Sequence, residues 1–260
     1  MITALSSRLP ILDTVCDNVR KWLPLAVCAA LSLGAIAQQP APAKPVVPDL
    51  KEADKNLPPM GGKWGLREAV VKDATLPNVL LIGDSILGGY LASVQKALEG
   101  KANIDAWVTP INQADKQLPK ILTEMLGAKK YAVIHFNLGL HGWQKGRIPE
   151  GQYEPLTRQM VETMKKAAPQ AKLVWASITP VTVKGEPGRP NPEIQPTIEM
   201  HNAMATKIME EEGVATNDLA GLMQSHLKLA AGDMFHWTPE GREMQAKAVA
   251  SSVSKLLPGK

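Results

Sequence analysis

Residues 78–89 read NVLLIGDSILGG, and this stretch decides the fold. Its first half, Asn78 to Gly83, is a short apolar run rich in branched residues, which is typical of a strand buried on both faces of a sheet. Apolar residues then recur at helical spacing, at Leu87, Leu91, Val94 and Leu98. Gly100 is expected to end this helix. The stretch therefore predicts a buried strand that turns directly into a helix.

The same alternation continues to the end of the chain. Further short apolar runs predict strands at 104–108, 131–136, 173–178 and 214–216. Apolar residues at helical spacing predict helices at 118–126, 153–168 and 194–208. A last helix opens at Thr238-Pro239-Glu240, which supplies an N-cap, a proline at the first helical position and an acid that complements the dipole. We expect one three-layer α/β/α sandwich with a mostly parallel, flavodoxin-like sheet, whose chemistry lies at the carboxyl ends of the strands.

The first 76 residues have a different character. Arg20 and Lys21 precede the apolar run 22–36, which ends in a small-x-small cleavage pattern at Ala37. This run is shorter than the ~20 residues that a membrane-spanning helix needs, although an uncleaved anchor remains the alternative. Export to the periplasm or the medium is expected, without stable membrane insertion after cleavage. We expect three segments: a signal peptide at 1–37, a Pro/Ala-rich linker and lead-in at 38–76, and a folded domain at 77–258.

Composition narrows the classes of partner. The formal net charge is only +4, and the Lys and Arg residues are scattered, so a nucleic-acid partner has little electrostatic support. Both cysteines, Cys16 and Cys28, fall inside the predicted signal peptide. A cleaved protein would then have no disulfide, no thiol nucleophile and no thiolate metal site. We expect neither a metal nor another cofactor, because no two histidines stand at metal-ligand spacing with a third acidic partner.

Gly83-Asp84-Ser85 comes directly after the first predicted strand and opens the first helix. A serine there has its hydroxyl at the carboxyl edge of the sheet, among the unpaired N–H groups of a helix N-terminus, which can stabilise an oxyanion. The alternative for this motif alone is a capping serine after a strand. Neither a dinucleotide-binding nor a phosphate-binding glycine pattern fits these residues.

His236 is the best-placed base for such a serine. It follows Asp233 by three residues, just before the last helix. In a loop this spacing lets the carboxylate of Asp233 accept a hydrogen bond from the imidazole, which fixes its tautomer and stabilises the imidazolium. Alone, this pair could be an ordinary helix-entry turn. Together with Ser85, it predicts a catalytic triad.

These two motifs resemble the first and last sequence blocks of the SGNH (GDSL-like) hydrolase superfamily, over residues 77–257. The resemblance implies a serine esterase in which Ser85 attacks an acyl ester and Asp233 and His236 complete the triad. It also implies an oxyanion hole built from two middle blocks. Asn112-Gln113-Ala114 resembles the second block, Asn-x-Gly, with Ala114 in place of the glycine whose N–H is a donor.

The third block, usually Gly-x-Asn-Asp, matches less well. Gly139 aligns with its glycine, but His141 stands where the asparagine should be, and Gly142 replaces the acid. The sequence resembles a bacterial subgroup with N-x-G-L-H-D at this point. Two side chains therefore compete for the donor role: Asn137, two residues before Gly139, and His141, which the alignment favours. Either could contribute ~3 kcal/mol to the transition state.

The other histidines and two tryptophans have plainer expectations. His135 should be a packed or bridging residue on a strand, whereas His201 and His226 should face solvent on helices. Trp143 and Trp237 flank proposed site residues and could stack on a sugar, although structural roles are the alternative.

The expected function is hydrolysis of an acyl ester, most simply an O-acetyl group on a polysaccharide or a smaller carbohydrate. A lipase-like or thioesterase-like acyl hydrolase is a variant of this function. The alternative from another class is a non-catalytic carbohydrate-binding protein of the same fold, motivated by the departures at Ala114, His141 and Gly142.

Overall fold

The computed structural model describes residues 64–259, and its centre is a six-stranded sheet in the order β1-β3-β2-β4-β5-β8. Neighbouring strands are parallel except for β1, which pairs antiparallel with β3. The strands of this sheet are β1 Gly65–Arg67, β2 Asn78–Gly83, β3 Asn103–Val108, β4 Val133–Phe136, β5 Lys172–Ala176 and β8 Ala215–Asn217. The five parallel strands have the flavodoxin-like order that the sequence predicted, since the chain runs from β2 outward to β3 and then back across β2 to β4.

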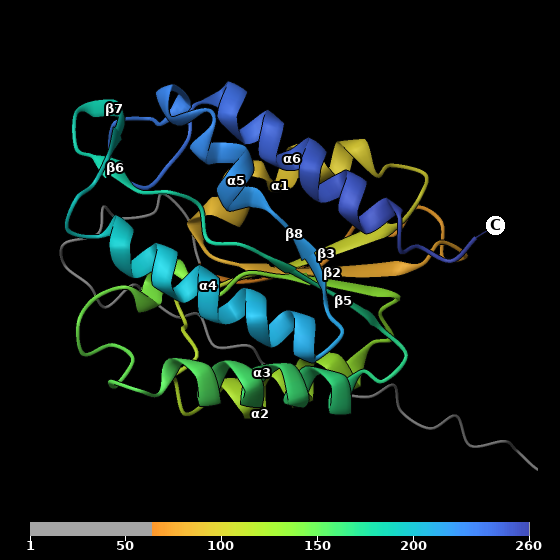
Figure 1. Ribbon diagram of the computed structural model, residues 1–260. Helices are drawn as coiled ribbons and strands as arrows, with labels where there is room; N and C mark the ends of the chain where they lie inside the picture. Colours follow the sequence, from red (N-terminus) through yellow and green to blue (C-terminus); the bar gives the residue numbers. More distant parts are fainter. Residues whose placement is uncertain (1–63, 260) are drawn as a thin grey trace, which may run out of the picture. The chain divides into compact units, whose positions relative to one another are not determined.

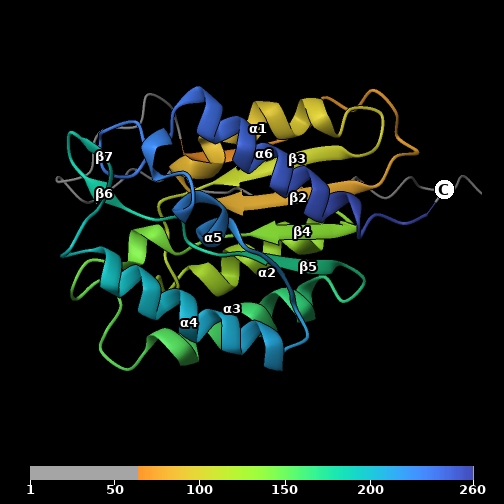
Figure 2. The same cartoon turned by 45° about the horizontal axis from the view of Figure 1, so that its top comes forward.

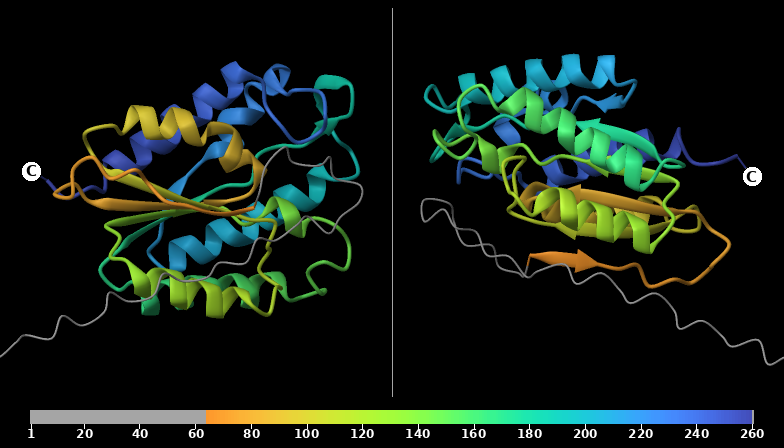
Figure 3. Two further views of the ribbon diagram at one scale, coloured as in Figure 1. Left: turned by 180° about the vertical axis from the view of Figure 1, so that it is seen from behind. Right: turned by 90° about the horizontal axis from the view of Figure 1, so that it is seen from below.

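Helices cover both faces of the sheet (Figure 1). One face carries α1 Ser85–Ala97, α5 Leu219–Gln224 and α6 Pro239–Ser254. The other carries α2 Leu118–Ala128, α3 Tyr153–Ala167 and α4 Gln195–Glu211. Figure 3 shows the same layers from behind and from below. The expected α/β/α sandwich is therefore confirmed.

The core consists of two apolar layers because side chains alternate along each buried strand. On β2, Leu80 and Ile82 pack towards α2, α3 and α4, whereas Val79 and Leu81 pack towards α1 and α6. All four side chains are at most 2% exposed. Such two-sided burial accounts for the continuous apolar run that marked β2 in the sequence.

Several elements lie outside the predicted pattern. The short strand β1 extends the sheet from within the lead-in, ahead of the domain start expected at Pro77. A hairpin of β6 Thr182–Val183 and β7 Glu186–Pro190 follows β5 and forms a separate two-stranded sheet. Two short 3-10 helices complete the fold, η1 Leu140–Gly142 and η2 Leu227–Leu229. The predicted signal peptide and most of the predicted linker lie outside the described residues.

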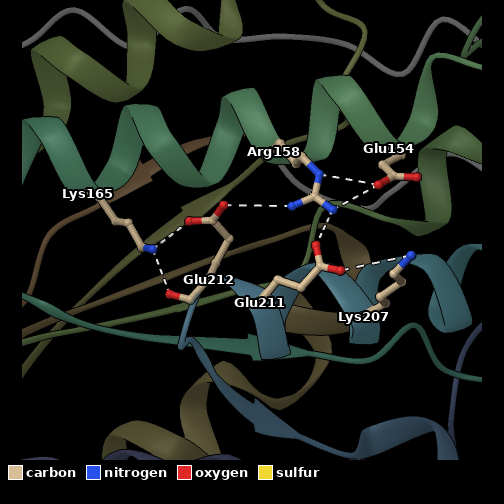
Figure 4. A network of polar contacts seen from close by, with 6 residues as sticks. All are labelled: Glu154, Arg158, Lys165, Lys207, Glu211 and Glu212. Carbon is tan, nitrogen blue, oxygen red and sulfur yellow. Dashed lines mark hydrogen bonds and ion pairs between the residues drawn. The ribbon is translucent and has the colours of Figure 1, made fainter.

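A network of charges joins α3 to α4 on the surface away from the sheet (Figure 4). Arg158 on α3 binds Glu154 on its own helix at 2.8 Å and also binds Glu211 on α4. Lys165 binds Glu212 at 2.6 Å. Single exposed pairs contribute about 0–1 kcal/mol each, but here Arg158 takes part in three pairs, of which those with Glu211 and Glu212 cross from α3 to the end of α4. The network ties the outer layer together at a distance from the carboxyl ends of the strands.

Candidate active site

Ser85 is the first residue of α1, directly after the end of β2. We call Gly83–Ser85 the nucleophile turn. The carboxylate of Asp84 caps the helix by accepting a hydrogen bond from the N–H of Ile86 at 2.9 Å. Glycine is required at position 83, because a Cβ there would lie 2.9 Å from the Cβ of Leu87. The turn therefore places the hydroxyl of Ser85 at the positive end of a helix.

The carboxyl end of β2 lies between the ends of its two neighbours. The carbonyl of Gly83 accepts a hydrogen bond from the N–H of Thr109, which follows β3, at 2.8 Å. On the other side, the carbonyl of Ile82 accepts one from the N–H of Asn137, which follows β4, at 2.9 Å. The loops that carry the second and third sequence blocks thus start on either side of Ser85. This is the switch point where parallel α/β sheets bind their ligands.

Asp233 and His236 form a hydrogen-bonded pair just before α6. We call residues 233–236 the acid–base turn. Oδ2 of Asp233 lies 2.6 Å from Nδ1 of His236, and Oδ1 accepts hydrogen bonds from the N–H groups of Phe235 and His236 at 3.1 and 2.8 Å. With Nδ1 facing the carboxylate, Nε2 is the ring nitrogen left to exchange a proton with a serine.

The environment of Asp233 favours its ionised form. Burial alone would raise the pKa of its carboxyl, but the hydrogen bonds from the backbone and imidazole of His236 outweigh burial, so the pKa lies below its ordinary value. The carboxyl therefore remains charged at neutral pH and can stabilise an imidazolium at His236.

The nucleophile turn and the acid–base turn meet across the packed side chain of Ile86. Ile86, next to Ser85, packs against the cluster that contains Phe235 and also against the cluster that contains Trp237. These two residues flank His236 in the chain. The buried carboxyl of Asp84 also interacts electrostatically with both His236 and His141. The contacts thus bring segments about 150 residues apart in the chain to one place.

The carboxyl of Asp84 is more buried than that of Asp233 and has the opposite shift. Burial raises the pKa of Asp84, and the attraction of His141 and His236 and the N–H of Ile86 do not cancel this effect. Asp84 is thus a capping residue whose negative charge costs stability.

Asn112 joins two loops at the edge of the site. Its Oδ1 accepts the N–H of Ala114 at 2.9 Å, and its Nδ2 donates to the carbonyl of His141 at 3.4 Å. The N–H of Ala114, which the sequence suggested as an oxyanion donor, therefore already has an acceptor. It would have to share this hydrogen bond or exchange it for a bond to a ligand.

Asn137 ties the end of β4 to the end of β5. Its Nδ2 donates to the carbonyls of Ala176 and Ser177 at 2.8 and 3.1 Å, and its Oδ1 accepts the N–H of Gly139 at 3.1 Å. Gly139 is required beside it, because a Cβ there would lie 2.2 Å from Cγ1 of Ile178. Both amide hydrogens of Asn137 are thus used within the protein.

His141 lies in η1 and is 5% exposed. Its imidazole contacts the ring of Trp64 edge to face, with centroids 5.6 Å apart. Its carbonyl also accepts a hydrogen bond from Nη1 of Arg147 at 3.0 Å. Trp64 was not assigned a place by the sequence, since nothing in its local pattern predicts a contact 77 residues along the chain. The contacts of the ring and the carbonyl hold His141 close to the carboxyl of Asp84.

The acid–base turn contains a strained backbone conformation. Met234 has φ 90°, the only positive φ of a non-glycine residue between positions 64 and 259. Such conformations cost about 1–3 kcal/mol and persist only where the surrounding structure imposes them, which is common at functional sites. The sequence gives no sign of this feature, because methionine does not favour a left-handed turn.

A small cavity lies behind the nucleophile turn. It holds about 10 Å³, close to the volume of one water-sized group. Its lining combines the polar residues Asp84, Tyr90, Asn137 and Thr179 with the apolar residues Ile86, Leu87, Leu140, Ile178 and Leu219. This volume is too small to hold an acyl group, and Ser85, Asp233 and His236 do not line the cavity.

The remaining histidines are structural. His135 on β4 bridges to Asn217 at the end of β8, with Nε2 3.0 Å from Nδ2, and burial lowers its pKa to about 4. The expectation that His201 faces solvent is wrong, because it is 6% exposed and stacks on Tyr153 at 3.9 Å. The sequence pattern suggests that His201 lies on a polar, exposed face of α4, but this face packs on α3. In the described part of the chain, no three His, Cys, Asp or Glu side chains gather as metal ligands would.

Comparisons with known proteins find similar folds among solved structures and no similar sequence. No family model matches the sequence, and no curated protein sequence matches it significantly. A family 3 carbohydrate esterase from Talaromyces cellulolyticus superposes with a TM-score of 0.58 and 16% identity, covering 70% of this chain and 98% of that one.

Two acetyl xylan esterases give similar results. Axe2 from Geobacillus stearothermophilus has a TM-score of 0.55 and 17% identity, covering 68% of this chain and 94% of its own. The acetyl xylan esterase AlAXEase has a TM-score of 0.57 and 17% identity, covering 68% and 99%. The fold of this chain is therefore that of carbohydrate esterases, as the sequence resemblance implied.

Proposed function

We propose that this protein is an exported serine esterase that removes small acyl groups, O-acetyl above all, from carbohydrate. The observation that carries the proposal is the hydrogen-bonded Asp233–His236 pair, whose neighbours Phe235 and Trp237 belong to the clusters against which Ile86, next to Ser85, packs. The structural neighbours support ester hydrolysis, because they include a family 3 carbohydrate esterase and two acetyl xylan esterases.

The proposed reaction begins with attack of Oγ of Ser85 on the acyl carbonyl while Nε2 of His236 takes the hydroxyl proton. Asp233 stabilises the imidazolium that results. The negative charge on the carbonyl oxygen is stabilised by the N–H groups at the start of α1 and by a side-chain donor, for which we favour His141. The hydrogen bonds of Asn137 to two carbonyls support this choice.

The tetrahedral intermediate then collapses. The C–O bond to the alcohol breaks, and the alcohol leaves with the proton that His236 carries, so that the acyl group stays on Ser85. A water molecule, deprotonated by His236, attacks the acyl-enzyme in the same way. It releases the carboxylic acid and restores the serine hydroxyl. No cofactor is needed for either half-reaction.

The carbohydrate part of the proposal is supported by the neighbours and by the predicted signal peptide, which would place the enzyme in the periplasm or outside the cell. Within residues 64–259, no helix is long and apolar enough to cross a membrane.

The decisive experiment compares the purified protein with Ser85→Ala. The protein should release p-nitrophenol from the acetate ester, more slowly from the butyrate and least from the octanoate, and should release acetate from acetylated xylan. Ser85→Ala should lower kcat by about 10⁴-fold or more on each substrate. Equal rates for the two proteins would contradict the proposal.

A carbohydrate-binding protein without activity is the second candidate. The observation that favours it is the N–H of Ala114, which is already bonded to Asn112. This candidate would be supported if the wild-type protein and Ser85→Ala bound acetylated xylan equally and neither hydrolysed it.

A further inference from the structure

The acid–base turn belongs to no helix and no strand of the main sheet. It lies between η2 and α6, and a short antiparallel contact closes its base. Ala230 forms an isolated bridge with Trp237, and the N–H of Ala231 donates to the carbonyl of His236 at 2.8 Å. These bonds join the ends of the turn but do not fix its middle, where Met234 has its strained conformation.

The β6–β7 hairpin donates hydrogen bonds to the middle of the acid–base turn and to Gly232, just before it. The N–H of Thr182 donates to the carbonyl of Met234 at 2.9 Å, and the N–H of Gly185 donates to the carbonyl of Gly232 at 2.8 Å. Figure 2 shows this hairpin at the end of the molecule to which the arrowheads of β2 and β4 point. Thr182 is fully buried, so its bond to Met234 is shielded from water.

The stem of the hairpin is itself anchored on α4. Oε1 of Gln195 accepts the N–H of Val181 at 2.9 Å, and the carbonyl of Val181 accepts the N–H of Asn191 at 2.8 Å. Gln195 is 8% exposed and is the first residue of α4. A continuous path of short hydrogen bonds therefore runs from α4, through residues 181–182, to Met234.

We propose that the β6–β7 hairpin is a positioning element for the acid–base turn, in which the N–H of Thr182 holds the carbonyl of Met234. The backbone conformation of Met234 decides where that carbonyl points and how Asp233, one residue earlier, faces His236. Methionine does not favour φ 90° by itself. The bonds of Asp233 Oδ1 and the burial of Phe235 shape the turn from within, and the bond from Thr182 fixes the carbonyl of Met234 from another element. The effect on turnover rests on the proposed function, whereas the effect on the Asp233–His236 hydrogen bond does not.

Two substitutions at position 182 test this positioning role. Thr182→Pro removes the N–H donor. Thr182→Ala keeps this donor and loses only a hydroxyl that has no hydrogen-bond partner among the described residues. The main readout is the downfield proton NMR signal of the His236 Nδ1–H in its short bond to Asp233, which needs no substrate. We expect Thr182→Pro to shift or broaden this signal and Thr182→Ala to leave it unchanged.

A second variant covers the case in which Thr182→Pro does not fold. Gln195→Met removes the acceptor of Val181 in a side chain of similar length and should also perturb the signal. Asn103→Leu is its control, because Asn103 donates two side-chain hydrogen bonds at the opposite end of the sheet. It should lower Tm without changing the signal.

Kinetics measure the consequence for the proposed enzyme. The Thr182→Pro or Gln195→Met change should lower kcat by about 10- to 100-fold, with a smaller change in KM. The positioning proposal is overturned if the His236 signal in both variants matches that of Thr182→Ala. An inactive wild-type protein would instead contradict the esterase proposal and leave the NMR comparison decisive.

Discussion

The nucleophile turn and the acid–base turn lie together but are built differently. Ser85 and Asp84 are 8% and 4% exposed and connect a buried strand to a long helix. The side chains of His236 and Asp233 are 29% and 39% exposed and lie in a turn without regular structure. The first turn is fixed by the core of the domain, whereas the second is held by the burial of Phe235 and by a few hydrogen bonds.

This difference matches the proposed tasks of the two turns. The serine must meet the acyl carbonyl at a fixed point, so a rigid turn at the edge of the packed core suits it. The imidazole receives a proton from the serine and passes it to the leaving alcohol, so it needs access to both partners. We therefore expect substitutions in the two turns to affect activity and stability in different proportions.

The largest expected effect is that of Asp233→Asn. The amide cannot stabilise the imidazolium and favours the wrong tautomer of His236, so kcat should fall by about 10⁴-fold. Steady-state kinetics on p-nitrophenyl acetate measure this loss, with circular dichroism as a check on the fold. A loss below tenfold in a folded protein would show that Asp233 does not orient the base.

His141→Ala should have the next largest effect. Loss of one oxyanion donor should lower kcat by about 10²-fold, with little change in KM. Asn137→Ala is the comparison, because it removes hydrogen bonds that tie β4 to β5 and should chiefly lower Tm. The opposite pattern of losses would transfer the donor role to Asn137.

Asp84→Asn should raise stability at neutral pH. The folded pKa of Asp84 lies above its ordinary value, so ionisation costs stability above that raised pKa and costs nothing below the ordinary one. The amide oxygen can still cap α1. Thermal melts should show Tm higher by ~2–4 °C at pH 7, and this difference should disappear towards pH 3. A lower Tm at pH 7 would mean that the charge of Asp84 is compensated.

Asp233 should respond to pH in the opposite sense. Its folded pKa lies below the ordinary value, so its ionised form adds stability above the ordinary pKa, and this contribution is lost as the pH falls through the lowered one. The same melts on Asp233→Asn should therefore show a lower Tm at pH 7 and convergence with wild type in acid.

The smallest expected effect separates backbone strain from side-chain packing at Met234. Met234→Gly and Met234→Ala both remove the side chain, but only glycine accepts φ 90° without strain. The glycine variant should be more stable than the alanine variant by about 1 kcal/mol, which urea unfolding can measure. Equal stabilities would show that the turn relaxes when the side chain is removed.

The same contrast explains what could be predicted from the sequence. The nucleophile turn has a local signature, because an apolar strand, a glycine and a helical apolar pattern follow one another within 20 residues. The start of α6, with its cap Thr238, is similarly local. These features predicted the alternating strands and helices and the place of Ser85, whereas the flavodoxin-like order was implied by the family resemblance.

The features that were missed depend on distant contacts. No local pattern shows that Thr182 donates to Met234, or that Trp64 contacts His141. The β6–β7 hairpin is not predicted because its sequence, rich in proline and glycine, resembles an ordinary loop. His201 was misjudged for the same reason, since its burial depends on Tyr153 of another helix.

The sheet described above ends in short strands on both sides. The outermost strands, β1 and β8, have three residues each, and β1 ends in the exposed Arg67. Another chain could therefore pair with only a few backbone groups at either edge, and the charge at Arg67 opposes close approach. Within residues 64–259, the sheet therefore offers little free strand edge on either side for aggregation with another chain.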